Sequence, residues 1–406
     1  MRDFFKNINA KFVLSILIVF LLGWNLGHWD VSIKLQNFKP SVSALSKEPP
    51  KNINIDFKLF WDTWNLLSRE YIDKSALDPQ KMFYGAISGM VSSLGDPYTV
   101  FLPPQQQKST KEDLGGAFEG VGIELGFKDK HLSVIAPLSG TPADKAGIKP
   151  GDLIVKIDNQ DSTGMSLPDA VKLIRGPKGT SIKLSILREN DGVEPKEYVI
   201  KRDTIIVKSV EVSYKQTGKK VAIIKLSRFG ERTNDEWKAA VSDIIPQNAE
   251  GVILDVRNNP GGFLESAVFI ASEFLEGGNV VLQENNAGVK TPFQVNRPGK
   301  LTKIPLLVLI NKGSASASEI VAGSLQDRKR AKLVGEKSFG KGTIQEAQDL
   351  ENGTGIHITV AKWLTPNERW VNNLGGLDPD IKVESSKDDT GKDPQMDKAL
   401  EWIMQN

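Results

Sequence analysis

Two short stretches of the chain combine a small-residue turn with a side chain that can do chemistry. Ser316 lies in the run Ser-Ala-Ser-Ala-Ser at 314–318, directly before an apolar helical pattern. Lys341 is flanked by glycines, and Gln345 follows four residues later. A serine hydroxyl needs a base to attack a carbonyl carbon, and a lysine amine is such a base when burial lowers its pKa. The pattern predicts Ser316 as a nucleophile, Lys341 as its base and Gln345 as a partner that orients the amine.

Backbone N–H groups close to these residues are candidates for stabilising a negatively charged transition state. Pro260-Gly261-Gly262 lies where an apolar strand pattern ends and a helical pattern begins, and Ala317 directly follows the predicted nucleophile. Unobstructed N–H groups at such places favour an oxyanion. We therefore expect the glycine turn and the N–H of Ala317 to form an oxyanion site. Alone, Pro-Gly-Gly usually marks only a turn, so this prediction depends on the serine segment.

The composition argues against several other chemistries. The 406 residues include no cysteine, which excludes disulfides, a thiol nucleophile and thiolate metal sites. Only three histidines are present, so a Ser–His–Asp triad and a histidine metal site are poorly supplied. We expect no metal and no cofactor. The formal net charge of +2 gives no indication of nucleic-acid binding.

Each chemical signal is also compatible with an ordinary structural role. Ser314 or Ser318 can be a simple helix cap, because serine is favoured at that position. A single lysine in a glycine-rich loop is usually solvated. The catalytic interpretation depends on the joint occurrence of the serine turn, the lysine loop and the glycine turn.

The elements that must position these residues are predicted as alternating strands and helices. The continuous apolar run at 306–310 and the segment 251–255, with its apolar centre, are typical of buried strands, and a helical pattern follows each of them. An alternating strand at 221–226 and a helix that begins near Thr233 precede them. Repeated strand–turn–helix units predict an α/β domain with a largely buried sheet.

From about residue 115 to 203 the pattern changes to short strands with glycine turns. A glycine-rich loop enters a strand at 120–123, a short helix follows over Pro142–Gly147, and Pro150-Gly151-Asp152 makes a turn. This order resembles a PDZ domain; an ordinary small β-domain is the alternative. The resemblance implies that a peptide's carboxy-terminal end adds as a strand to the module, with its carboxylate held by loop N–H groups. The substrate-binding candidates are Gly120, Val121, Gly122 and Ile123.

The amino terminus predicts a membrane anchor. Residues 12–29 carry no formal charge and are mostly apolar, and basic residues precede them. This length is at the lower limit of about 18 residues for a membrane-spanning helix. Because no convincing cleavage site follows, we expect an uncleaved signal-anchor rather than a signal peptide, with a buried soluble helix as the alternative. The rest of the protein would then lie on the extracytoplasmic side, in the periplasm or at the cell exterior.

A polar linker that contains prolines follows the predicted anchor, and we expect it to be a flexible tether. After it come two helical patterns, the first of which has an aromatic face. Phe57, Phe60, Trp61 and Trp64 have the spacing of one helix face, and Pro79 fits the first turn of a second helix. Such a row of aromatic residues is typical of packing between helices. The alternative is that the helical pair is a dimerisation element, which would make the protein a homo-oligomer.

The motifs together resemble the carboxy-terminal processing peptidases, also called tail-specific proteases. The similarity runs from about Asp56 to the end of the chain. It is carried by segments 93–99, 258–262, 311–319, 335–345, 364–366 and 377–380. The resemblance implies a crotonase/ClpP-like α/β core with an inserted mainly-β PDZ domain, an N-terminal helical segment and an N-terminal transmembrane helix. It also implies catalytic roles for Ser316, Lys341 and Gln345, with Gly262 as one oxyanion donor.

Two details qualify the resemblance. An arginine in the PDZ segment of this family couples the module to activity, which implies a regulatory role for Arg175; a solvated charge at a helix end is the alternative. Glu368 stands where the family commonly has a glycine, away from the predicted chemistry.

We therefore expect a membrane-anchored serine endopeptidase that binds protein substrates by their free carboxy-terminal tails. The predicted parts are an anchor over 1–30, a linker over 31–54, a helical segment over 55–114, the PDZ domain over 115–203, the peptidase core over 204–386 and a C-terminal helix over 387–406. A non-catalytic PDZ adaptor that presents clients to another protease is the first alternative. An acyl-CoA-type enzyme is the second, because glycine-rich oxyanion loops also serve thioester chemistry.

Overall fold

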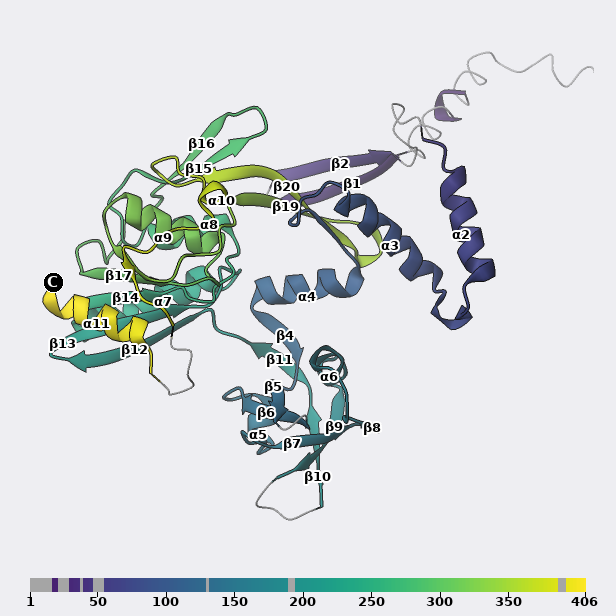
Figure 1. Ribbon diagram of the computed structural model, residues 1–406, viewed down its shortest axis with the longest axis horizontal. Helices are drawn as coiled ribbons and strands as arrows, with labels where there is room; N and C mark the ends of the chain where they lie inside the picture. The colour runs from purple at the N-terminus through teal and green to yellow at the C-terminus, as the bar shows by residue number, and fades with distance from the viewer. Residues whose placement is uncertain are drawn as a thin grey trace, which may run out of the picture. The chain divides into compact units, whose positions relative to one another are not determined.

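The computed structural model describes residues 17–20, 29–36, 39–46, 55–128, 131–188, 194–385 and 392–406. The chain divides into two compact units, residues 1–82 and residues 83–406 (Figure 1). The first unit holds the amino-terminal strands and the first helix of the predicted helical pair, and the boundary between the units falls within the second helix. The second holds the predicted PDZ module and the α/β core.

The first unit contains a hairpin in the predicted linker. Strands β1 (Trp29–Gln36) and β2 (Lys39–Ser46) pair antiparallel along their whole length. This corrects the expectation of a flexible tether for residues 34–36 and 39–46, which lie in the two strands. The reason is visible in the sequence of β1, where Val31, Ile33 and Leu35 alternate with polar residues, the period of a β-strand.

The predicted helical pair is present as helices α2 (Lys58–Glu70) and α3 (Pro79–Ser92), with a short 3-10 helix, η1 (Lys74–Ala76), after α2. The aromatic face of α2 packs ring on ring, with the centroids of Phe60 and Trp61 5.0 Å apart. No residue of α2 is buried.

The predicted membrane span is largely outside the described residues. Within the described ranges, no helix has the length and apolar character needed to cross a bilayer. Of the segment 12–29, residues 17–20 are helical and Trp29 begins β1. The anchor thus stays a prediction.

The predicted PDZ module folds as a small antiparallel β-domain with its own apolar core. Its sheet has the order β10-β9-β7-β6-β5, and β8 pairs with β7. The bounds are β5 (Ile123–Lys128), β6 (His131–Pro137), α5 (Pro142–Lys145), β7 (Leu153–Ile157), β8 (Gln160–Asp161), α6 (Leu167–Ile174), β9 (Ser181–Leu187) and β10 (Lys196–Lys201). The chain enters and leaves the module through an antiparallel pair, β4 (Ala117–Gly120) and β11 (Asp203–Ile206). Strand β5 lies at the edge of the sheet, as peptide binding by strand addition requires.

The core is built on a six-stranded sheet of order β12-β13-β14-β17-β18-β21, parallel except for the edge strand β12. The strands are β12 (Val210–Thr217), β13 (Lys219–Leu226), β14 (Gly251–Asp255), β17 (Leu306–Ile310), β18 (Lys332–Gly335) and β21 (Ile381–Lys382). The helices beside it are α7 (Thr233–Ile244), with the 3-10 helix η2 (Ile245–Gln247) directly after it, α8 (Leu264–Ala271), α9 (Ala317–Asp327), α10 (Val371–Leu374) and α11 (Pro394–Gln405). The α/β prediction is confirmed.

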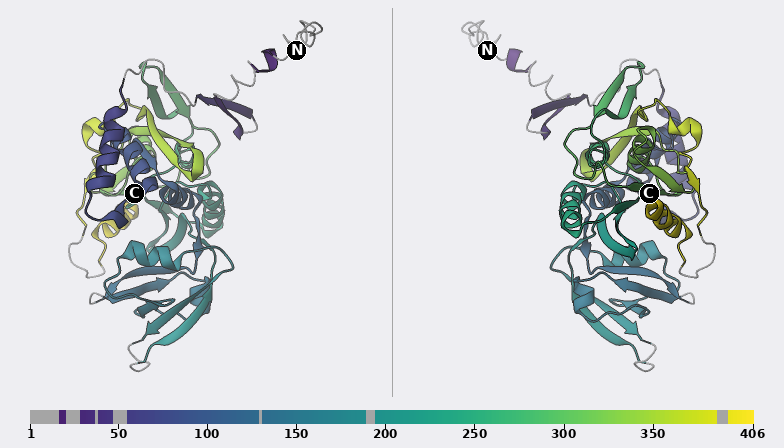
Figure 2. Two further views of the ribbon diagram at one scale, coloured as in Figure 1. Left: turned by 90° about the vertical axis from the view of Figure 1, so that its right-hand side faces the viewer. Right: turned by 90° about the vertical axis from the view of Figure 1, so that its left-hand side faces the viewer.

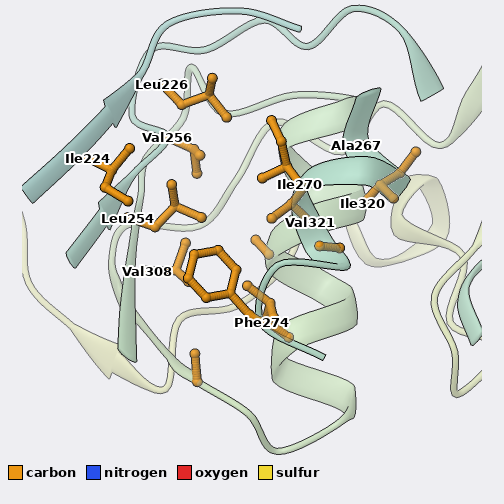
Figure 3. Packing of buried hydrophobic residues seen from close by; sticks show 14 of the residues in the cluster. Ile224, Leu226, Leu254, Val256, Ala267, Ile270, Phe274, Val308, Ile320 and Val321 are labelled. Atoms are coloured by element: carbon orange, nitrogen blue, oxygen red, sulfur yellow. The ribbon is translucent and has the colours of Figure 1, made fainter. Parts of the chain in front are cut away.

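Alternation along the central strands explains how both faces of this sheet are covered. Leu254 and Val308 contribute to the large apolar cluster with α8 and α9 (Figure 3). Their neighbours Ile253 and Leu307 belong to a second cluster with the C-terminal helix α11, coloured yellow in Figure 2. Because side chains alternate across a strand, a run of five apolar residues serves both faces.

A second, antiparallel sheet completes the core. It contains β16 (Lys290–Gln294), β15 (Asn279–Asn285), β20 (Gly355–Leu364) and β19 (Thr343–Asp349), and β3 (Val100–Leu102) also pairs with β20. The 3-10 helix η3 (Glu351–Gly353) joins β19 to β20, and helix α4 (Pro104–Gly115) follows β3. This sheet brings segment 343–349 and the residues around 100 to one strand, β20.

Candidate active site

Ser316 lies at a strained turn between a buried strand and a helix. Its φ of 55° and ψ of −115° are unusual for a residue with a side chain, and α9 begins at the next residue. A serine on a sharp turn between strand and helix is the geometry of a nucleophile elbow. The predicted small-residue turn is therefore present.

The two flanking serines hold this turn against the loop that follows β14. The hydroxyl of Ser314 donates to the carbonyl of Val256 at 2.8 Å, and that of Ser318 donates to the carbonyl of Asn259 at 2.8 Å. Strands β14 and β17 are parallel neighbours, so the loops after them meet at one edge of the sheet. Neither serine is the simple helix cap that was considered as an alternative.

The glycine turn lies directly against the predicted nucleophile. A Cβ atom on Gly261 would be 2.8 Å from the Cβ of Ser316. The N–H of Gly261 already donates to Oδ1 of Asn259 at 2.9 Å. In contrast, the N–H groups of Gly262 and Ala317 donate to no acceptor among the described residues. These two amides are therefore available to a ligand oxygen, and Gly261 is not.

The backbone of Lys341 is held by hydrogen bonds, and its amine lies over an aromatic ring. Its carbonyl accepts from Nε1 of Trp363 at 3.0 Å, and its Nζ lies 4.9 Å from the centre of the Tyr98 ring. Within the described part of the chain, Nζ forms no ion pair. Burial lowers the pKa of Lys341, although the negative charges of Asp96 and Glu319 act in the opposite direction. A lysine in this state can accept a proton.

Gln345, on β19, is fixed by two threonines. Its Nε2 donates to the hydroxyl of Thr343 at 2.9 Å and to that of Thr359 at 3.0 Å. The predicted bond to the Lys341 amine is not among the hydrogen bonds of the described residues. Because both bonds use the amide nitrogen, the side-chain oxygen remains available as an acceptor.

The structure brings these side chains to one cavity of about 450 Å³. Ser316, Lys341, Gln345 and Gly262 all line it, and Ala317 follows Ser316 directly. Its apolar lining includes Phe293, Ile320, Ile344 and Trp363. No group of carboxylates and histidines in the described ranges is arranged to hold a metal ion. A nucleophile, a lysine of lowered pKa and amide donors without acceptors among the described residues can together carry out acyl transfer.

The most connected residue of the site is Glu319, for which the sequence analysis gives no role. Its carboxylate is fully buried and accepts from the N–H of Ser316 at 2.8 Å, the hydroxyl of Ser338 at 2.6 Å, and the N–H groups of Gly340 and Lys341 at 2.7 and 2.9 Å. Burial raises the pKa of Glu319, and these hydrogen bonds oppose the rise. The sequence does contain a signal for Glu319. It lies three residues after Ser316, which is the position of the glutamate in a capping box.

The four candidates in the PDZ module have different surroundings. Gly122 has a φ of +80°, and a Cβ there would lie 2.5 Å from Thr141, so this position requires glycine. The Val121 side chain is buried in the module's core, while Gly120 pairs with Asp203 of β11 and Ile123 begins the edge strand β5. The N–H groups of Val121 and Gly122 have no acceptor among the described residues, as a carboxylate site requires.

Arg175 lies away from the cavity but contacts an element that reaches it. Its guanidinium pairs with Glu112 of α4 at 3.0 Å and lies 4.3 Å from the centre of the Phe118 ring. It is therefore not the solvated helix-end charge of the alternative interpretation. Residues of the same helix α4, Asp113 and Leu114, line the cavity.

Comparisons with known proteins show the family of the chain. The chain matches peptidase family S41 over residues 220–383, the PDZ domain over 134–188 and the activating protease CtpB N-terminal domain over 30–105. It is 39% identical to the carboxy-terminal processing protease CtpA of Bacillus subtilis, over 78% of this chain and 67% of that protein. It is 38% identical to CtpB of the same organism, over 79% and 66%.

The fold is also that of a solved structure. A putative S41 protease from Bacteroides fragilis superposes with a TM-score of 0.57 at 16% identity, covering 88% of this chain and 99% of that one. The sequence similarity to CtpA extends over most of both chains. The chain belongs to the S41 family of carboxy-terminal processing serine peptidases, with an inserted PDZ domain.

Proposed function

We propose that the chain is an endopeptidase with a Ser316–Lys341 dyad that cleaves proteins bound by their free carboxy-terminal tails. The observation that carries this proposal is the cavity itself. It joins a strained serine, a half-buried lysine without an ion pair among the described residues, and two amides with no acceptor there. A structural role explains none of these features, because each has a free-energy cost that packing alone does not require.

The chemistry follows from the geometry. Oγ of Ser316 attacks the peptide carbonyl while the amine of Lys341 accepts the hydroxyl proton. The oxygen of the tetrahedral intermediate accepts from the N–H groups of Gly262 and Ala317. Lys341 then donates the proton to the leaving amine, and an acyl group remains on Ser316. Water, deprotonated by the same amine, hydrolyses this ester. The side-chain oxygen of Gln345 is an acceptor for Nζ when the lysine is protonated.

Tail binding is assigned to the PDZ module. Edge strand β5 offers its free side to an extended peptide, and the N–H groups of Val121 and Gly122 can hold the terminal carboxylate. The names of the curated relatives, carboxy-terminal processing proteases, agree with substrates of this kind.

The proposed location is the extracytoplasmic face of a membrane. It is supported by the uncharged apolar segment 12–29 and the basic residues before it. Cell fractionation of the full chain is the check, since recovery of an intact chain that washes off membranes with salt would contradict an anchor.

The dyad is tested with purified Ser316→Ala and Lys341→Ala variants against an unfolded protein that ends in an apolar tail. We expect both variants to lose at least about 10³-fold in rate, because each lacks one partner of the proton transfer. Ser324→Ala and Lys337→Ala are matched controls. Ser324 bonds within α9, and Lys337 pairs with Asp378 on the surface, so both should cleave normally. Cleavage retained in either dyad variant would end the proposal, and tail binding without fragments in the wild type would favour the adaptor.

A further inference from the structure

The amine of Lys341 is covered by Tyr98, a residue that precedes the PDZ module by about twenty positions. Nζ lies 4.9 Å from the centre of the tyrosine ring, within the range of an amine over an aromatic face. Tyr98 is half-buried and is not among the residues that line the cavity. The Tyr98 ring therefore contacts the Lys341 amine without lining the cavity in which the substrate would bind.

The loop that carries Tyr98 is fixed to the site by a series of hydrogen bonds. The N–H of Tyr98 donates to Asp96 at 3.0 Å, and the hydroxyl of Thr99 donates to the same carboxylate at 2.6 Å. The N–H of Thr359 donates to Thr99 at 3.0 Å, and the hydroxyl of Thr359 accepts from Gln345 at 3.0 Å. Strand β3, which follows directly, pairs with β20 at His357. The loop that carries the ring is thus attached to β20, the strand to which the Gln345 side chain of β19 also bonds.

We propose that Tyr98 is a positioning residue of the peptidase site, whose ring keeps water from the Lys341 amine and holds it in the cavity that Ser316 lines. The inference rests on the proposed dyad and adds a residue to it. Asp96 and the two threonines act through Tyr98, since they set the position of its loop.

The Tyr98 ring has two opposite effects on the pKa of Lys341. Their balance decides whether removal of the ring raises or lowers this pKa. An aromatic face attracts an ammonium ion and so favours the charged form. The same ring excludes water, which disfavours the charged form. Burial is the largest influence on the pKa of Lys341 and lowers it, against the nearby charges of Asp96 and Glu319. The inference takes the ring to be part of this burial, so that its exclusion of water outweighs its attraction for the ammonium ion.

Four titratable groups face the amine or act on it, and only one of them is removed in the test. Asp96 and Glu319 favour the protonated lysine, and Tyr98 covers it. The pKa of His357 is lowered by burial and by the charge of Lys341. Since the three other groups stay in place, a shift in the Tyr98 variants reports the loss of the ring.

The test measures kcat and KM of the full chain between about pH 5 and 10, for wild type, Tyr98→Ala and Tyr98→Phe, on a peptide with a free carboxy terminus. In Tyr98→Ala we expect the acid limb of kcat to move up by about one pH unit, which lowers the rate about tenfold on that limb, with little change in KM. Phenylalanine keeps the ring and should rescue the profile. The pH dependence of Ser316 labelling by a fluorophosphonate should shift in the same way.

Tyr214→Ala is the matched control, because Lys220 Nζ lies 5.3 Å from the centre of that ring outside the site. An unshifted acid limb in Tyr98→Ala, or an equal loss of rate at every pH, would overturn the inference. So would failure of Tyr98→Phe to rescue, since the hydroxyl would then be the acting group. Failure of the dyad itself is distinct, because it appears as cleavage by Ser316→Ala.

Discussion

At the scale of single residues, the site holds Ser316 in a backbone conformation that most side chains avoid. Such a conformation costs about 1–3 kcal/mol and persists only where surrounding contacts over-determine it. Here the surrounding contacts converge on Glu319, which binds the N–H of Ser316 and the N–H groups of Gly340 and Lys341. Each hydrogen bond to a charged acceptor contributes about 1.5–3 kcal/mol. One carboxylate therefore offsets the strain of the serine turn and fixes the lysine loop to it.

This role predicts the effect of Glu319→Gln. The glutamine side chain has only one acceptor atom, its oxygen. Its NH₂ group would therefore point at donors that bond to a carboxylate oxygen of Glu319 in the wild type. We expect the free energy of unfolding to fall by about 2 kcal/mol or more and the cleavage rate to fall at least about tenfold. Chemical unfolding and peptide hydrolysis measure the two effects.

The matched control is Glu336→Gln, because the half-buried Glu336 pairs with Lys312, at 3.8 Å, rather than with the serine turn. It should change neither quantity by much. A Glu319→Gln protein with normal stability and rate would show that the serine turn and the lysine loop are held by other contacts.

At the scale of elements, helix α4 joins the PDZ module to the catalytic cavity. Glu112 of α4 pairs with Arg175 at the end of α6, and Asp113 and Leu114 of α4 line the cavity. We therefore expect a change in the position of α6 to act on the cavity through this one helix. This is a physical route for the regulatory role that the family resemblance implies for Arg175.

This contact predicts what happens when the charges of Arg175 and Glu112 are exchanged. Arg175→Glu places two carboxylates together, and since a partly exposed ion pair contributes about 1 kcal/mol, we expect kcat/KM to fall about fivefold. Combining it with Glu112→Arg should restore most of the activity. Lys178→Ala, which breaks an exposed pair with Asp203, is the control. A single variant with wild-type kcat/KM and a double variant no different from it would exclude this coupling.

Some features of the fold and of the site could be predicted from the sequence, and others could not. The buried strands at 251–255 and 306–310 were predictable because a short, continuous apolar run that ends at a glycine or serine turn is typical of a central strand. The contact of Tyr98 with Lys341 was not, because 243 positions separate them and the pairing of β3 with β20 creates it. Hairpin β1–β2 was missed since its prolines and lysines outweighed the alternating Val31, Ile33 and Leu35.

At the scale of the whole second unit, the core and the PDZ module have separate apolar clusters. Their covalent junction is the pair β4–β11, in which Gly120 lies opposite Asp203. Two strands in this register can be closed by a two-residue turn. Residues 121–202 can therefore be replaced by Asn-Gly without changing either strand.

This replacement separates tail recognition from peptide hydrolysis. We expect the shortened protein to keep a folded core and to cleave a peptide and its carboxy-terminal amide at equal rates, whereas the wild type should prefer the free carboxylate at least about tenfold. Gly122→Ala in the full chain should have a similar effect on selectivity, because its Cβ would lie 2.5 Å from Thr141 and displace the loop N–H groups. If the shortened protein still preferred the free carboxylate, the tail would have to be recognised by the catalytic core, and the amides of Val121 and Gly122, which have no acceptor in the described part of the chain, would need another ligand.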